Sequence, residues 1–232
     1  MSASPTTPKS LDLLAVEVLN RLKGHPAVAA LILGGGIALK HYLDFRPTHD
    51  IDAWWVESVN DDAVHLIDKI MKDVAEAHGF RYAIRTWGDT ASYEIRDGSK
   101  KVFSFQVSVR DVQLEPAGPS TWAPLKLESL ADNVGSKMNA VVRRGAPRDF
   151  VDIYELVTRE LVTADECWRL WQRKNPGVDV QQAKESVARN MSELELRTPL
   201  GRLPKDQRER AENRRTFFKT EFIGRPDRRS SS

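Results

Sequence analysis

The spacing of hydrophobic residues changes along the chain, and each change predicts a different element. Apolar residues recur every three to four positions between Leu11 and Leu22 and again between Val64 and Val74, which is the spacing of an amphipathic helix. Unbroken or alternating apolar runs that end in turn residues predict strands instead. We expect strands at residues 28–33, 50–56, 80–86, 90–96 and 101–111, and a short helix at 37–43.

The pattern becomes helical from about residue 125 onward. Helices are expected over residues 127–144, 149–161, 180–196 and 204–222, with another opening at the capping sequence Thr163–Glu166. The change of pattern predicts an α/β core followed by a helical part. The expected division is a disordered N-terminus (1–9), a core (10–124), a helical C-terminal domain (125–222) and a basic flexible tail (223–232).

The composition is that of a globular protein with a proper core, with 41% hydrophobic and 29% charged residues among 232. No apolar run approaches the roughly 20 residues that span a bilayer, so no membrane segment is expected. The N-terminus lacks the basic and apolar segments of a signal peptide. A single cysteine, Cys167, excludes a disulfide framework and a cysteine-based zinc site. A cytoplasmic location is therefore expected.

The positive charge is concentrated near the C-terminus. Residues 201–232 hold ten Lys and Arg against five Asp and Glu, whereas the whole chain has a net charge of only +2. Such a segment could contact the phosphates of a nucleic acid. It could equally be a solvated helix and tail, and the sequence leaves both interpretations open.

A glycine turn and a pair of aspartates form the main chemical feature of the sequence. The predicted strand at 28–33 ends in Gly34, Gly35 and Gly36, which allow a backbone to approach a phosphate closely. Asp50 and Asp52 open the next strand, where period-two alternation places both carboxylates on one face. Two hard oxygen ligands at this spacing suit Mg²⁺. The alternative is a simple tight turn next to two solvated acids.

Lys137 is the next most informative residue. It continues an apolar helical stripe formed by Leu130, Val134 and Val141, and a lysine on a core-facing stripe needs a negative partner. A triphosphate or the two aspartates of the strand could supply that partner. Alternatively, the lysine extends its ammonium to solvent at the edge of the stripe.

Asp149 and Asp152 open the following predicted helix. Asp149 favours a helix N-terminus electrostatically, which can be its entire role. Asp152 lies one turn later on the same face, where it could pair with Lys137 or Arg148 and fix the position of the lysine.

The strand predicted from residue 103 alternates cleanly. Its Phe and Val residues are expected to face the core, and Ser104, Gln106 and Ser108 the other side, where a third metal ligand would be sought. That face holds no carboxylate. Asp111 and Glu94 are the other acids within reach, and both could equally be surface residues.

These residues together resemble a known family. The stretch from Leu33 to Leu39 with Asp50-Ile51-Asp52 resembles motif I of the DNA polymerase β-like nucleotidyltransferase superfamily. The stretch Asp132–Ala140, followed by Arg148–Leu156, is similar to the AbiEii/AbiGii toxin family, whose relatives include the MenT toxins. The resemblance covers about residues 28–160.

The resemblance implies a fold, an activity and partners. It implies a mixed-sheet nucleotidyltransferase core, followed by a helical C-terminal domain, that transfers a nucleoside monophosphate from an NTP with Mg²⁺ or Mn²⁺. The acceptor implied is RNA, notably the tRNA 3′ end, and the partner implied is a cognate antitoxin. Asp50 and Asp52 would hold the metal, Gly34, Gly35 and Gly36 would cradle phosphate, and Lys137 would bind the triphosphate. Asp149 and Asp152 match the later acidic motif.

One position departs from the superfamily pattern. The third carboxylate of the superfamily sits on a later strand, and the best match here is Ser108. That acid normally helps to deprotonate the attacking hydroxyl and to hold a second metal. The alternatives to RNA transfer are therefore nucleotidylation of a protein or small molecule, and a degenerate domain that binds nucleotide or a partner without transfer.

Overall fold

The computed structural model describes residues 4–110 and 112–224, and the chain forms two compact units. The N-terminal unit extends to Asn133 and the C-terminal unit begins at Val134. Within the described ranges, no helix is both long and apolar enough to cross a bilayer. Predictions for residues 1–3, for Asp111 and for the tail from residue 225 lie outside the described residues.

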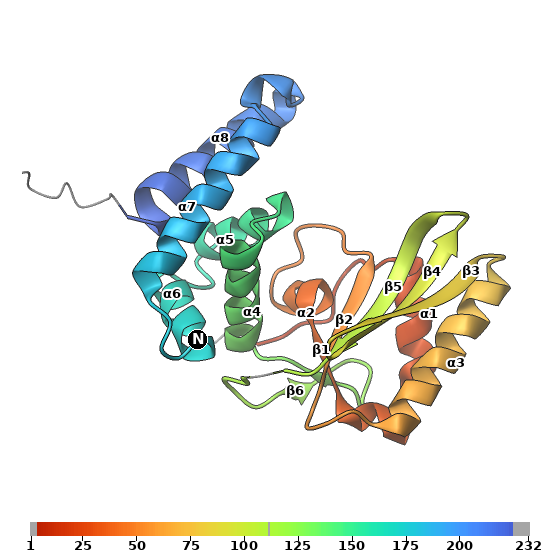
Figure 1. Ribbon diagram of the computed structural model, residues 1–232. Helices are drawn as coiled ribbons and strands as arrows, with labels where there is room; N and C mark the ends of the chain where they lie inside the picture. The colour runs from red at the N-terminus through yellow and green to blue at the C-terminus, as the bar shows by residue number, and fades with distance from the viewer. Residues whose placement is uncertain (1–3, 111, 225–232) are drawn as a thin grey trace, which may run out of the picture. The chain divides into compact units, whose positions relative to one another are not determined.

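The N-terminal unit is built on one mixed sheet of seven strands in the order β3-β4-β5-β2-β1-β7-β6 (Figure 1). β2 runs antiparallel to β1 and parallel to β5, so these two strands flank it. The mixed α/β fold class is thereby confirmed. The strands are β1 (Leu31–Gly34), β2 (Asp50–Trp55), β3 (Arg81–Trp87), β4 (Thr90–Asp97), β5 (Lys100–Ser108), β6 (Gly118–Pro119) and β7 (Lys126–Leu127).

Helices α1 (Leu13–Leu22) and α3 (Asp61–Ala77) supply the apolar partner of this sheet. Their inward positions and one face of the strands form a single buried cluster, in which Phe103 and Phe105 of β5 are fully buried. The expected alternation is confirmed for Phe103, Phe105 and Val107. The strand ends at Ser108 rather than at residue 111, and Val109 beyond it is exposed. The opposite face carries Asp50 and Asp52 of β2 and Ser104 of β5, together with Trp54 and the buried Ile32.

The first strand differs from its prediction. The apolar run at 28–33 begins as a 3₁₀ helix, Pro26–Ala30, and only Leu31–Gly34 is strand. Pro26 fixes its backbone angle for a turn, and the His25 ring accepts a hydrogen bond from the N–H of Ala27 at 3.4 Å. The very short strands β6 and β7 were not predicted, because their two-residue pairings leave no periodic signal.

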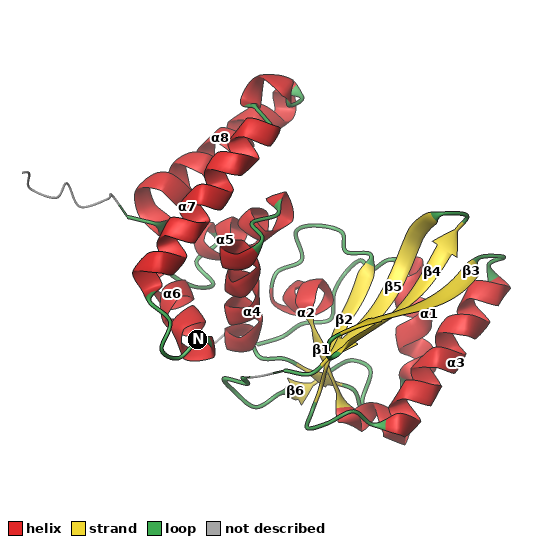
Figure 2. Ribbon diagram, viewed as in Figure 1, coloured by secondary structure: helices red, strands yellow, loops and turns green. Residues whose placement is uncertain are grey.

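The C-terminal unit is helical (Figure 2). Helix α4 (Leu130–Arg143) contains the boundary between the units, and α2 (Gly35–Tyr42) belongs to the N-terminal unit. Trp168 and Trp171 are buried in this unit, and the indole N–H of Trp168 donates to the carbonyl of Phe222 at 2.9 Å. The other elements are α5 (Pro147–Thr158), α6 (Ala164–Lys174), α7 (Val180–Arg197), α8 (Lys205–Phe217), the 3₁₀ helix Leu200–Arg202 and the π-helical turn Phe218–Phe222.

Candidate active site

The glycine turn lies directly against the aspartate strand. Gly34 ends β1 in register with Asp52 of β2, and Gly35 begins α2 with a backbone φ of +58°. A Cβ atom at Gly35 would lie 2.0 Å from Oδ2 of Asp52 and 2.7 Å from its Cβ. Both the left-handed backbone and the missing side chain are therefore required at this position.

The two neighbouring glycines are equally enclosed. A Cβ atom at Gly34 would lie 2.2 Å from Nε1 of Trp54, and one at Gly36 would lie 2.5 Å from Oγ1 of Thr48. These contacts come from β2 and from the loop before it. The three glycines thus allow a close approach between two strands and a helix start, which a simple surface turn would not need.

Asp50 and Asp52 share one face of β2, as the alternation predicted. Ile51, Ala53 and Trp55 are buried on the other face, while both aspartates are half-buried. Oδ1 of Asp50 accepts a hydrogen bond from the Ser104 hydroxyl at 2.9 Å and lies 3.4 Å from Nζ of Lys101.

The carboxylate of Asp52 has no hydrogen-bond or ion-pair partner among the described residues. It is the half-buried acid closest to the helix start at Gly35. The oxygens of such a carboxylate can bind a cation or accept a hydrogen bond from a ligand.

The residues of β5 beside the two acids are neutral. In register, Asp50 faces Ser104, Asp52 faces Gln106 and Trp54 faces Ser108. Ser108, predicted to occupy the position of the third acid, thus stands beside a tryptophan, and its hydroxyl lies 2.8 Å from that of Thr90. Gln106, rather than Ser108, is the neighbour of Asp52.

Within the described residues, no three His, Cys, Asp or Glu side chains converge on one point. Glu94 forms ion pairs with Arg96 and, at 3.8 Å, with Arg85. The donor set of Asp50 and Asp52 is therefore two hard oxygen ligands on a half-exposed face. This set fits Mg²⁺, which binds one or two carboxylates and completes its shell with substrate phosphates and water.

A buried carboxylate that sequence reasoning missed holds the turn in place. Glu128 is fully buried, and its Oε1 accepts from the backbone N–H of Gly35 at 3.1 Å and from the amide of Asn133. Its Oε2 accepts from the indole N–H of Trp54 at 3.0 Å and forms an ion pair with Arg110. One side chain thus ties together α2, β2 and the segment before α4.

The charge of Glu128 is balanced locally. The Arg110 guanidinium also lies 3.3 Å from Asp132 Oδ1 and stacks over the Trp54 ring, 5.1 Å from its centroid. Tyr42 donates its hydroxyl proton to the Glu128 carbonyl at 2.8 Å, and burial, followed by the nearby Glu128 charge, raises the pKa of Tyr42 to about 12. In the sequence, this network was indicated only by Glu128, a charged residue that lies among apolar residues.

The start of α2 can still receive an anion. The first N–H groups of a helix have no partner within the helix. Glu128 accepts from the N–H of Gly35, and no side chain among the described residues accepts from the N–H groups of Gly36 and Ile37, the next two residues of the helix. Backbone N–H groups at a helix N-terminus are suited to phosphate oxygens.

The predicted basic and acidic residues of the C-terminal unit form two ion pairs. Nζ of Lys137 lies 2.7 Å from Oδ2 of Asp152, which is fully buried, whereas the lysine side chain is 12% exposed. Asp149 accepts two hydrogen bonds from Arg144, at 2.8 and 2.9 Å, and one from the N–H of Ala146 at 3.1 Å. Asp152 therefore pairs with Lys137, as predicted, and Asp149 caps its helix.

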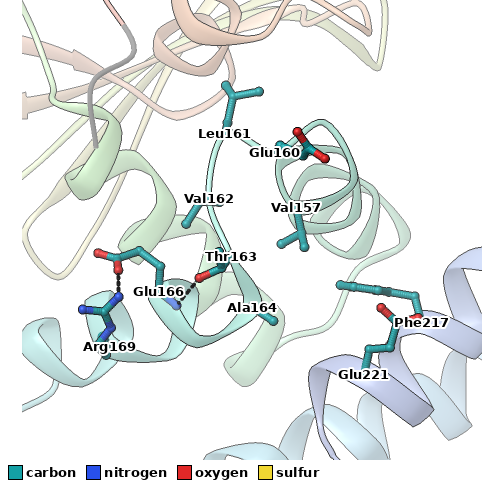
Figure 3. Close-up of a pocket in the computed structure, with 10 residues that line it drawn as sticks. All are labelled: Val157, Glu160, Leu161, Val162, Thr163, Ala164, Glu166, Arg169, Phe217 and Glu221. Carbon is teal, nitrogen blue, oxygen red and sulfur yellow. Dashed lines mark hydrogen bonds and ion pairs between the residues drawn. The ribbon is translucent and has the colours of Figure 1, made fainter.

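A pocket of the C-terminal unit has the wrong charge for a nucleotide (Figure 3). It has a volume of about 540 Å³, and Glu166 at its rim pairs with Arg169. Glu160 and Glu221 contribute further carboxylates, which would repel a polyphosphate. The lining residues are Val157, Glu160, Leu161, Val162, Thr163, Ala164, Glu166, Arg169, Phe217 and Glu221.

Comparison with known proteins agrees with the geometry of the glycine turn and the aspartate pair. The family model described as nucleotidyl transferase AbiEii toxin, type IV toxin–antitoxin system, matches residues 17–227. A search of curated proteins gives no match. The matched range extends over most of both units and includes the glycine turn, the aspartate pair and both ion pairs of the C-terminal unit. The chain therefore belongs to the AbiEii family of nucleotidyl transferase toxins, whose members act on a nucleotide substrate and are paired with a cognate antitoxin.

Proposed function

We propose that the protein transfers a nucleoside monophosphate from an NTP to an RNA acceptor, with the 3′ end of tRNA as the expected site, in a Mg²⁺-dependent reaction. The observation that carries the proposal is the close approach of the Asp52 carboxylate to Gly35, which is the first residue of α2 and is followed by the N–H groups of Gly36 and Ile37. A cation ligand and a phosphate cradle then stand next to each other.

The residues of the N-terminal unit have separate tasks in this reaction. Asp50 and Asp52 would hold the divalent ion, which when bound neutralises charge on the triphosphate. The amides of α2 would orient a phosphate, and Glu128 would keep the turn rigid by holding the N–H of Gly35. Orientation of the α-phosphorus for in-line attack by a hydroxyl is the main contribution that such a site can make.

Lys137 is proposed as a ligand of the triphosphate, with Asp152 as the residue that fixes its ammonium. The support is chemical: the pair is nearly buried, and a buried ammonium with one carboxylate partner can donate two more hydrogen bonds. Asp149 and its Arg144 partner are proposed to stabilise the start of α5.

The test is label transfer. Each of the four NTPs, labelled at the α-phosphate, is incubated with total tRNA and Mg²⁺, and labelled RNA is separated from protein and small molecules. We expect label in RNA with at least one NTP, and none after chelation or in Asp52→Asn. Label in protein or in a small molecule instead would support the alternative acceptors and contradict the RNA proposal.

A second candidate, a domain that binds nucleotide without transferring it, is favoured by the neutral neighbours Ser104 and Gln106 on β5. It predicts that NTP binds in the presence of Mg²⁺ but is never consumed. Calorimetric binding with no label transfer to any acceptor would support it.

A further inference from the structure

The pairing between β4 and β5 changes register at one place beside the site. Ile95 faces Phe103, and the next pair is Arg96 with Lys101, so β5 advances two residues where β4 advances one. Val102 is the extra residue of a β-bulge, a feature that re-aims side chains near active sites.

The bulge determines on which face of the sheet the Lys101 side chain lies. In a regular strand, Lys101 would lie two residues from Phe103 and would share its face, and Phe103 is fully buried in the core. The extra residue instead places Lys101 opposite Arg96. Lys101 therefore lies on the polar face, where Nζ donates to the Ser104 hydroxyl at 3.0 Å and lies 3.4 Å from Oδ1 of Asp50.

Stability does not account for this placement. The Lys101 and Asp50 side chains are 40% and 33% exposed, and an ion pair that is this exposed to solvent contributes little to stability. The ammonium can therefore leave Asp50 at little cost. Nearby Arg96 and Arg85 differ, because both are engaged by the buried carboxylate of Glu94.

We infer that Lys101 is a phosphate-binding residue of the site, an inference that rests on the proposed function. A divalent ion at Asp50 would repel the neighbouring ammonium, which then needs another anion within reach of its side chain. Both the NTP and an RNA acceptor bring phosphate groups to this face. Lys101 pairs with Asp50 when no phosphate is present and with a phosphate oxygen when one is bound.

The experiment measures binding without turnover, using the full chain with Mg²⁺ and two probes: inorganic tripolyphosphate and a short single-stranded oligoribonucleotide. The test variant is Lys101→Met, and the matched control is Lys100→Met, which removes the same charge from the adjacent exposed position. We expect Kd to rise about tenfold in Lys101→Met for at least one probe and less than about twofold in Lys100→Met. Lys101→Arg should retain most of the affinity.

The two probes identify the source of the phosphate. A loss on tripolyphosphate assigns Lys101 to the nucleotide, and a loss on the oligoribonucleotide alone assigns it to the acceptor. The inference is overturned if Lys101→Met binds both probes like wild type, if Lys100→Met loses as much, or if wild type binds neither. Wild-type binding without label transfer would refute the proposed function and leave the assignment of Lys101 intact.

Discussion

Two pairs of aspartates in this protein differ in their burial and in their partners. Asp50 and Asp52 of β2 are half-buried, and Asp52 has no partner among the described residues. Asp149 and Asp152 of α5 are fully buried, and each has a basic partner. A carboxylate that the fold satisfies contributes to structure, whereas one that the fold leaves accessible is available for a ligand. The pairs look similar in the sequence, so partners, rather than residue type, distinguish their roles.

The contrast between the two acid pairs would be wrong if Asp52 had only a structural role. If Asp52 holds the metal as proposed, Asp52→Asn should lower nucleotidyl transfer at least about a hundredfold, because replacing a metal ligand costs more than the roughly 10–100-fold typical of a supporting residue. Thermal stability should stay close to that of wild type. The rate and the melting temperature are measured together, with Glu57→Gln, an exposed acid just after β2, as the control. A melting temperature that falls with an unchanged rate would contradict our interpretation.

In contrast to Asp52→Asn, Asp152→Ala should mainly lower the stability of the fold. Removing one partner of a buried pair leaves Lys137 uncompensated and should cost about 3 kcal/mol in the free energy of unfolding. The control Glu155→Ala, one turn away, breaks a pair with Arg159 that is 53% exposed on the arginine side and should cost less than about 1 kcal/mol. Urea unfolding measures both.

A double variant sharpens this result. Lys137→Met combined with Asp152→Leu removes both charges and should recover much of the lost stability, because an apolar pair of similar volume is often as stable as a buried ion pair. Recovered stability without recovered nucleotide binding would separate the structural role of the pair from the proposed role of Lys137. Equal loss in the single and double variants would argue against a charge-based cost.

Gly35→Ala tests the contact between the turn and Asp52. The left-handed backbone alone costs roughly 1–2 kcal/mol for a residue with a Cβ atom. Gly98→Ala is the matched control, because Gly98 has φ +56° and no atom within 4 Å of an added Cβ. We expect Gly35→Ala to lose more stability than Gly98→Ala in urea unfolding, and to lose nucleotide binding, which the control should keep. Equal losses would mean that the contact with Asp52 is unimportant.

The smallest expected effect concerns pH. His41 is buried beside the site: its Nδ1 lies 2.9 Å from the carbonyl of Ile37, and its Nε2 has no partner among the described residues. Burial lowers the pKa of His41, against the opposing effect of the Ile37 hydrogen bond. The unfolded chain therefore takes up the proton first, so stability should fall as pH drops below about 6.5. His41→Gln should flatten this dependence between pH 7.5 and 5, whereas the exposed control His65→Gln should not.

The local features of the site were predictable from the sequence. Three glycines after an apolar run, and two aspartates one residue apart, carry their geometry in their spacing, and both were found as predicted. The pairing of Lys137 with Asp152 was one of two expected for Asp152, because Lys137 lies on an apolar helical stripe and needs a negative partner.

The long-range features were not predictable. Glu128 meets Gly35 across 93 positions of the chain, and no periodicity links the two. The position of Lys101 was not predictable, because strict alternation from Phe103 places it on the core face. The bulge at Val102 places it on the polar face instead. Gln106 was identified on the correct face, but its register with Asp52 required the pairing of β5 with β2.

The link between Glu128 and Gly35 has a consequence for the synthesis of the protein. The glycine turn and both aspartates of β2 are translated early, but the carboxylate that fixes the turn comes 93 residues after Gly35. A truncated product that ends before this codon would contain the whole motif and would lack its anchor. Fragments that end before Glu128 should therefore fail to hold the glycine turn in place, although they contain every residue of the turn and both aspartates of β2.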